Sequence, residues 1–95
     1  MAFSPRANTV NVAVTGTAQD LALPSIPGEG STIRLSNVGT QTVFINFFTT
    51  ATVSNAMPMT NTSSIVVDKG ALSSISVIAS TTGSTLYATV GIGGV

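Results

Sequence analysis

The chain has 95 residues, which is the size of one small domain. It contains no cysteine, no histidine and only three basic and three acidic side chains, so its net charge is zero. These counts exclude disulfides, ordinary zinc or haem sites, and catalysis by Ser-His-Asp or Cys-His groups. We therefore expect no cofactor and no metal. Three basic residues are too few for a phosphate-binding patch, and no apolar run is long enough to span a membrane, so we expect neither nucleic acid nor membrane as a partner.

The surface must be built from neutral side chains. Charged residues make up 6% of the chain, against about 25% in an average soluble domain, whereas Ser and Thr together supply 27 of the 95 residues. A neutral exterior promotes association. We expect other chains to cover much of this surface, although a monomer solubilised by hydroxyl groups is the alternative.

Apolar and polar residues alternate with a period of two along most of the chain, which is typical of β-strands. After an N-terminal arm, this pattern predicts six strands and one weaker strand at 20–23; the six lie at 9–15, 31–36, 41–48, 63–67, 73–80 and 84–92. Asn37 to Thr40 is predicted to form a turn, and 68–70 a polar turn. The strand at 41–48 is apolar on both sides, which predicts a central strand covered on each face.

Short strands at intervals of about 8 to 12 residues indicate a sandwich or a small barrel. We predict an all-β fold with no significant helix: a small antiparallel β-sandwich, either jelly-roll-like or Ig-like. The arm covers residues 1–8, and residues 9–95 form a single domain. Two prolines and two glycines make 24–30 a loop.

The segment 49–62 is predicted to be a long loop because its apolar residues do not alternate. One interpretation is a crossover that lies over one end of the sandwich, with Met57 and Met59 filling the core. The other is an arm that docks Met57 and Met59 into a neighbouring chain, since methionine adapts to irregular surfaces.

An enzyme is not expected. The only carboxylates are Asp20, Glu29 and Asp68, and acid–base catalysis by carboxylates needs two of them together. Asp20 and Glu29 flank the loop at 24–30 and could approach each other, but solvated charges at turns are commoner. None of the many hydroxyl groups has a marked general base beside it.

Two segments carry a family resemblance. The first is Ile33-Arg34-Leu35-Ser36-Asn37-Val38-Gly39-Thr40-Gln41-Thr42-Val43-Phe44-Ile45, and the second is Ile75-Ser76-Val77-Ile78-Ala79-Ser80-Thr81-Thr82-Gly83-Ser84-Thr85-Leu86-Tyr87-Ala88-Thr89-Val90-Gly91-Ile92-Gly93. They resemble a group of small structural proteins of tailed bacteriophages. The resemblance implies a non-enzymatic β-sandwich that decorates, or cements, the outer surface of a phage head. The alternative is a tail, spike, receptor-binding or carbohydrate-binding module of the particle.

The neutral surface predicts a homo-oligomer, and a trimer is the first expectation because it suits threefold positions on an icosahedral shell. With the resemblance, this implies binding to the major capsid protein. The expected location is the outer capsid surface of the virion. Met1 to Pro5 lack the basic and apolar blocks of a secretory signal, so we expect synthesis in the cytoplasm of a bacterial host.

Six residues are candidates for partner contact. Phe3 and Pro5 lie on the arm, where Phe3 is either an aromatic anchor or a lid over the core of its own sandwich. Arg6 and Arg34 are candidates for bidentate pairing with carboxylates of the shell, or else solvated or paired within the chain. Met57 and Met59 complete the set.

Overall fold

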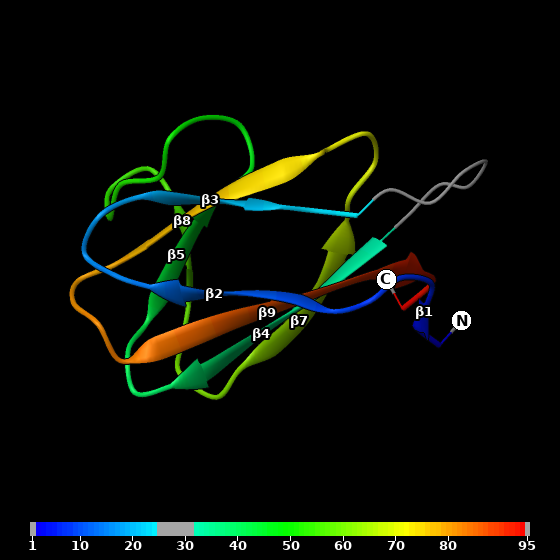
Figure 1. Cartoon of the computed structure of the whole chain (residues 1–95), viewed down its shortest axis with the longest axis horizontal. Coiled ribbons are helices and arrows are strands. Elements are labelled where there is room, and N and C mark those ends of the chain that lie inside the picture. Colours follow the sequence, from blue (N-terminus) through cyan, green and yellow to red (C-terminus); the bar gives the residue numbers. More distant parts are fainter. Residues whose placement is uncertain (1, 25–31, 95) are drawn as a thin grey trace.

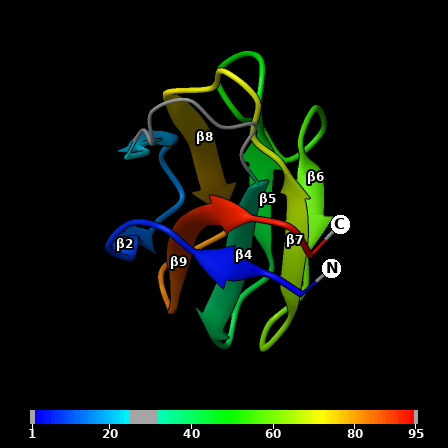
Figure 2. The same cartoon turned by 90° about the vertical axis from the view of Figure 1, so that its right-hand side faces the viewer.

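The computed structural model describes residues 2–24 and 32–94, and within them it contains strands but no helix. Two antiparallel sheets pack face to face and form a β-sandwich (Figures 1 and 2). The fold class predicted from the sequence is therefore confirmed. The strands are β1 (Ser4–Pro5), β2 (Val10–Val14), β3 (Gln19–Ala22), β4 (Thr32–Gly39), β5 (Val43–Asn46), β6 (Met57–Met59), β7 (Ser64–Asp68), β8 (Ser74–Ala79) and β9 (Ser84–Ile92).

The strand pairing is nested. β2 pairs with β9, β3 with β8, β4 with β7 and β5 with β6, as in one long hairpin that has been folded over. Pairing of β4 with β9 completes one sheet, of order β2-β9-β4-β7, and pairing of β5 with β8 completes the other, of order β3-β8-β5-β6. The short strand β1 also pairs with β9. This is the arrangement of a jelly roll, which decides between the two sandwich types that the sequence left open.

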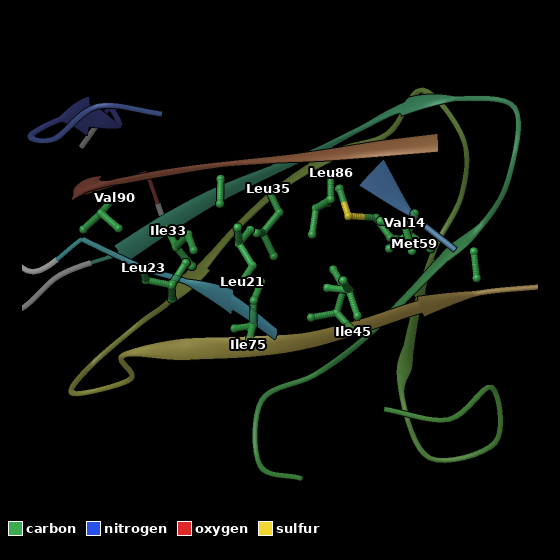
Figure 3. Close-up of a cluster of buried hydrophobic side chains, with 14 residues drawn as sticks. Val14, Leu21, Leu23, Ile33, Leu35, Ile45, Met59, Ile75, Leu86 and Val90 are labelled. Atoms are coloured by element: carbon green, nitrogen blue, oxygen red, sulfur yellow. The ribbon is translucent and has the colours of Figure 1, made fainter. Parts of the chain in front are cut away.

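The core lies between the two sheets (Figure 3). Ile33, Leu35 and Leu86 come from one sheet and meet Ile45 and Ile75 from the other, and all five are at most 2% exposed. Each such side chain contributes about 1.5–3 kcal/mol by leaving water. With no disulfide available, this layer is the main source of stability.

Several predicted boundaries are wrong in informative ways. β4 continues through Asn37 to Gly39, so the predicted turn at these residues is part of a strand, and the chain turns after Gly39. The predicted long loop at 49–62 contains the short strand β6, which forms the edge of its sheet. An edge position tolerates Pro58, because proline offers no N–H to a further strand. The weaker strand predicted at 20–23 exists as β3, whereas most of the predicted loop at 24–30 falls outside the described residues.

The N-terminal arm is part of the fold. β1 pairs with the end of β9, and the backbone N–H of Arg6 donates a 2.9 Å hydrogen bond to the carbonyl oxygen of Val90. In Figures 1 and 2 the two ends of the described chain lie together at one end of the sandwich. The predicted arm is therefore docked on β9 through Ser4, Pro5 and Arg6.

Candidate interaction surfaces

Phe48 is the most exposed large apolar side chain of the described residues, with 91% of its surface open to solvent. It follows β5 directly. The sequence predicts that the strand continues to Phe48 and is covered on both faces, and this is wrong at Phe48. The strand ends at Asn46, because the side-chain oxygen of Asn46 accepts hydrogen bonds from the backbone N–H groups of Phe48 (2.8 Å) and Thr49 (2.9 Å). Asparagine side chains often end a strand in this way, because they bond nearby backbone N–H groups that would otherwise pair with a neighbouring strand.

The loop that carries Phe48 is fastened to the outer face of the β3-β8-β5-β6 sheet. The Asn46 amide donates to the carbonyl oxygen of Asn55 (3.1 Å), and the backbone N–H of Ala51 donates to the hydroxyl of Ser76 (2.9 Å). Ala51 is 1% exposed as a result. Asn55 closes the loop on itself, since its side chain bonds the backbone of Thr52 and Thr50. Phe48 therefore stands in solvent on a loop that is held in place.

Two hollows flank Phe47, Phe48 and Leu72, and these three residues line both. The first, of about 410 Å³, has mostly polar walls and is called here the polar hollow; its other lining residues are Asp20, Asn46, Thr49, Thr50, Ala71, Ser73, Ser74 and Ser76. The second, of about 380 Å³, has mostly apolar walls and is called the apolar hollow; its other lining residues are Val67, Asp68, Lys69 and Gly70. Both volumes fall within the range of small-molecule sites.

Five of the polar side chains around the polar hollow have no partner within the described part of the chain. They are Asp20, Thr49, Thr50, Ser73 and Ser74. By contrast, the side chains of Asn46 and Ser76 are buried and bonded to the loop. The hollow thus combines a fixed base with a rim of free hydroxyl groups and one carboxylate.

A second surface lies on the opposite side of the sandwich, on the outer face of the sheet that contains β9. The strand register places its residues in three cross-strand rows, and we call these together the Tyr87 face. The rows are Thr9, Thr89, Arg34 and Val66; Asn11, Tyr87, Ser36 and Ser64; and Ala13, Thr85 and Val38. Tyr87 is 38% exposed and Val38 55%. Arg34 is the one charged side chain among these rows.

Arg34 is held in position on the Tyr87 face. Its Nε donates a 3.0 Å hydrogen bond to the hydroxyl of Ser64, which lies 3.3 Å from the hydroxyl of Ser36. The terminal guanidinium nitrogens make no hydrogen bond to another described residue. Arg34 can therefore present its planar end to a carboxylate from outside, which is the geometry of a bidentate pair.

The other predicted contact residues fall elsewhere. Phe3 packs on the end of β9, where a Cβ added at Gly91 would lie 2.8 Å from its ring and a Cβ at Gly94 the same distance from its own Cβ. This contact is within the chain and Phe3 is partly buried, so a shell contact by its remaining exposed surface stays a prediction. Pro5 and Arg6 are exposed beside it.

The two methionines separate. Met59 is 3% exposed in the core, as the first interpretation of the segment 49–62 expects, so its place among the partner contacts is corrected. Met57 is 37% exposed on the edge strand β6 and stays a candidate contact.

Sequence reasoning missed several residues that shape these surfaces. The alternation predicts a covered strand through Phe48, although Asn46, two positions before it, is a residue type that favours turns and signals the end of the strand. The sequence predicts a polar turn at 68–70, but Lys69 is only 6% exposed and lines the apolar hollow. The turn composition at 68–70 does not mark this, because Phe47 and Phe48 reach the same hollow from a distant segment.

The structure adds little to the question of catalysis. Glu29 lies outside the described residues, so its predicted approach to Asp20 is not described. In the described ranges, no three His, Cys, Asp or Glu side chains form a group that could hold a metal ion. Over the same ranges, no helix is long and apolar enough to cross a membrane.

A scan against protein-family models finds no match, and searches of curated proteins and of solved structures find none either.

Proposed function

We propose that this chain is a non-enzymatic structural protein of a phage particle, which decorates the outer surface of the head and stabilises it. It acts as a homo-oligomer, with a trimer as the first expectation, and it contacts the major capsid protein through the Tyr87 face. The observation that carries the proposal is this face itself. It is a broad sheet surface with an exposed tyrosine, an exposed valine and a single positioned arginine.

The composition of the Tyr87 face suits a protein interface. Tyr and Arg are enriched among the residues that dominate binding energy, and charged residues are depleted from interface centres. The surrounding Ser, Thr and Asn side chains can make direct or water-mediated hydrogen bonds at low desolvation cost. Each contact can be weak, because repeated sites on one lattice convert modest affinity into avidity.

Two further observations support the proposal by analogy. Jelly rolls are frequent in viral capsid domains, although a fold alone does not fix a function. The two sequence motifs that resemble phage structural proteins include Arg34, Tyr87 and Thr89 of the Tyr87 face.

A second candidate is a tail, spike or receptor-binding module of the same particle. Phe48, exposed beside the polar hollow, favours it, because an exposed aromatic ring at a hollow is a common feature of binding sites. Electron microscopy of the particle separates the two candidates. Density for the chain over the shell supports decoration, and density on the tail supports the second candidate.

The decoration proposal is tested by adding purified protein to phage heads that lack it. Occupancy is measured by gel densitometry, and head stability by the temperature of DNA release. We expect Arg34→Glu and Tyr87→Ala each to lower affinity for heads by about 30-fold, the effect of losing about 2 kcal/mol at an interface hot spot. Val53→Ala, an exposed position on the Phe48 loop, is the matched control and should bind normally. Full occupancy by both Tyr87-face variants, or DNA release at one temperature with and without the protein, would reject the proposal.

A further inference from the structure

We infer that the polar hollow is a binding site for a neutral saccharide, with the ring of Phe48 as the platform for one pyranose unit and Asp20 as an acceptor for its hydroxyl groups. This inference goes beyond the proposed function and does not depend on it. The polar hollow opens on the outer face of the β3-β8-β5-β6 sheet, whereas the Tyr87 face belongs to the other sheet. Both surfaces can therefore be occupied at once.

The first argument is the state of Phe48. Phe48 leaves 91% of its aromatic side chain in water, which is unfavourable, whereas Phe47 next to it packs against the core. Two hydrogen bonds to Asn46 and the burial of Ala51 fix the backbone on either side. The backbone at Phe48 therefore needs little further ordering when a ligand binds, which favours binding of a flat apolar partner by the ring.

The second argument is the chemistry of the rim. A pyranose presents C–H groups on one face and hydroxyl groups around its edge, so it needs an apolar plate flanked by hydrogen-bonding groups. The polar hollow offers that combination: the ring of Phe48, and beside it the free hydroxyls of Thr49, Thr50, Ser73 and Ser74. Hydroxyl side chains both donate and accept, as sugar hydroxyls do.

The third argument concerns charge. Asp20 is the one charged side chain among the described residues that line the polar hollow. The register holds it opposite Ser76, which in turn lies opposite Asn46, so all three stand on the same face of the sheet. A carboxylate is a strong acceptor for hydroxyl groups and repels anions. The hollow should therefore take neutral sugars and reject acidic ones.

Other ligand classes fit the polar hollow less well. Asp20 is the one acidic side chain among the described residues of the polar hollow, and a single carboxylate does not make a cation site. A phosphate or nucleotide would meet a negative charge and no basic side chain among the described lining residues. An apolar peptide side chain would fit the apolar hollow, which Val67 lines, better than the polar hollow with its mostly polar walls.

The test uses the full chain labelled with ¹⁵N and followed by NMR during titration. The probes are the methyl pyranosides of glucose, galactose, mannose and N-acetylglucosamine, with sialic acid as the anionic comparison. We expect saturable shifts of the amides of Phe48, Thr49 and Ser74 for at least one neutral probe, with a Kd of about 1–10 mM, as befits a single small ring. Sialic acid should bind at least about tenfold more weakly.

Matched variants assign the effect to the site. Phe48→Ala should weaken binding at least about tenfold, while Phe48→Trp should keep or tighten it, because the larger ring is a better platform. Asp20→Asn should weaken binding of the neutral sugar. It should also reduce the ratio between the Kd for sialic acid and the Kd for the neutral sugar. Val53→Ala, exposed on the same loop but outside the lining of the hollow, should bind as the parent does. Thermal melts confirm that each variant is folded.

Three results would overturn the inference. They are the absence of saturable binding by all four neutral probes at about ten times the expected Kd, binding that survives both Phe48→Ala and Asp20→Asn, and a preference for sialic acid. If Phe48→Ala instead lowers head occupancy and no sugar binds, Phe48 is a shell contact and the saccharide site is wrong. Because sugar binding is measured on the free protein and decoration on heads, each proposal can fail while the other stands.

Discussion

The side-chain oxygen of Asn46 accepts a 2.8 Å hydrogen bond from the backbone N–H of Phe48, and the same oxygen accepts a second bond, from Thr49. One amide therefore ends β5, turns the chain and sets the direction in which Phe48 leaves the sheet. Because Asn46 is only 8% exposed, these bonds form where water competes little.

Asn46→Ala is expected to lower the free energy of unfolding by about 1–3 kcal/mol, since it leaves backbone groups of the loop without their partner. For a domain of this size, that corresponds to a fall in Tm of at least about 4 °C. Thermal melts followed by circular dichroism measure it. Asn11→Ala, at an exposed strand position, is the control and should change Tm very little. Equal melting temperatures for the two variants would contradict the role given to Asn46.

Gly91→Ala is expected to detach the N-terminal arm. A Cβ at this position would collide with the carbonyl oxygen of Ser4 and press into the ring of Phe3, so β1 cannot keep its place on β9. The amide of Arg6, which bonds to the carbonyl of Val90, should then lose its protection from hydrogen exchange. Val12, within β2, should remain protected. An Arg6 amide that still exchanges slowly would show that the arm is held by something other than this contact.

Met59→Ala and Met57→Ala are expected to differ strongly in stability. Met59 is 3% exposed in the core, so truncating it should cost about 2–5 kcal/mol. Met57 is 37% exposed at the sheet edge, so truncating it should cost less than about 1 kcal/mol. Urea denaturation of the two variants gives both values. A similar loss for both would mean that the edge strand packs differently from the structure described here.

Asn37→Asp is expected to be more damaging than Asn37→Ala. Asn37 is 1% exposed, and its amide nitrogen donates to the carbonyl oxygens of Gln41 (2.9 Å), Met59 (2.9 Å) and Thr60 (3.1 Å). Alanine removes these bonds and should cost about 1–3 kcal/mol. Aspartate replaces a donor by a buried negative charge that faces three acceptors, which is worse than a lost bond. Urea denaturation at neutral pH compares the two variants, with Asn61→Asp at an exposed position as the control. The prediction is contradicted if Asn37→Asp is more stable than Asn37→Ala.

The strands themselves could be predicted from the sequence because alternation is a local signal. β9 is the clearest case, since Leu86, Ala88 and Val90 point inward between outward Thr85, Tyr87 and Thr89. The limits of strands depended on contacts that are not local. Asn37 followed by Gly39 has the composition of a turn, yet Asn37 is buried and its side chain donates a hydrogen bond to Met59 of β6. Gly39 has a φ of 140° and lies against the backbone of Gly83 and Ser84.

The candidate surfaces were harder to predict for the same reason. Arg34 was identified as a contact candidate, but its place beside Tyr87 follows from the pairing of β4 with β9, which alternation does not encode. The polar hollow gathers Asp20, Phe48 and Ser74 from three distant segments. Only the order in which the strands pair brings them together.

The nested pairing also determines when the fold can be completed. Val10, near the start of the chain, pairs with Ala88, so β2 has no partner until nearly all of the sequence has emerged from the ribosome. The innermost pair, β5 with β6, can close long before that. Folding should therefore proceed outward from this hairpin and should be slow for such a short chain, because distant segments must meet before their contacts stabilise anything. During that interval the apolar valines of β2 stand uncovered, and a chaperone has its best opportunity to bind them.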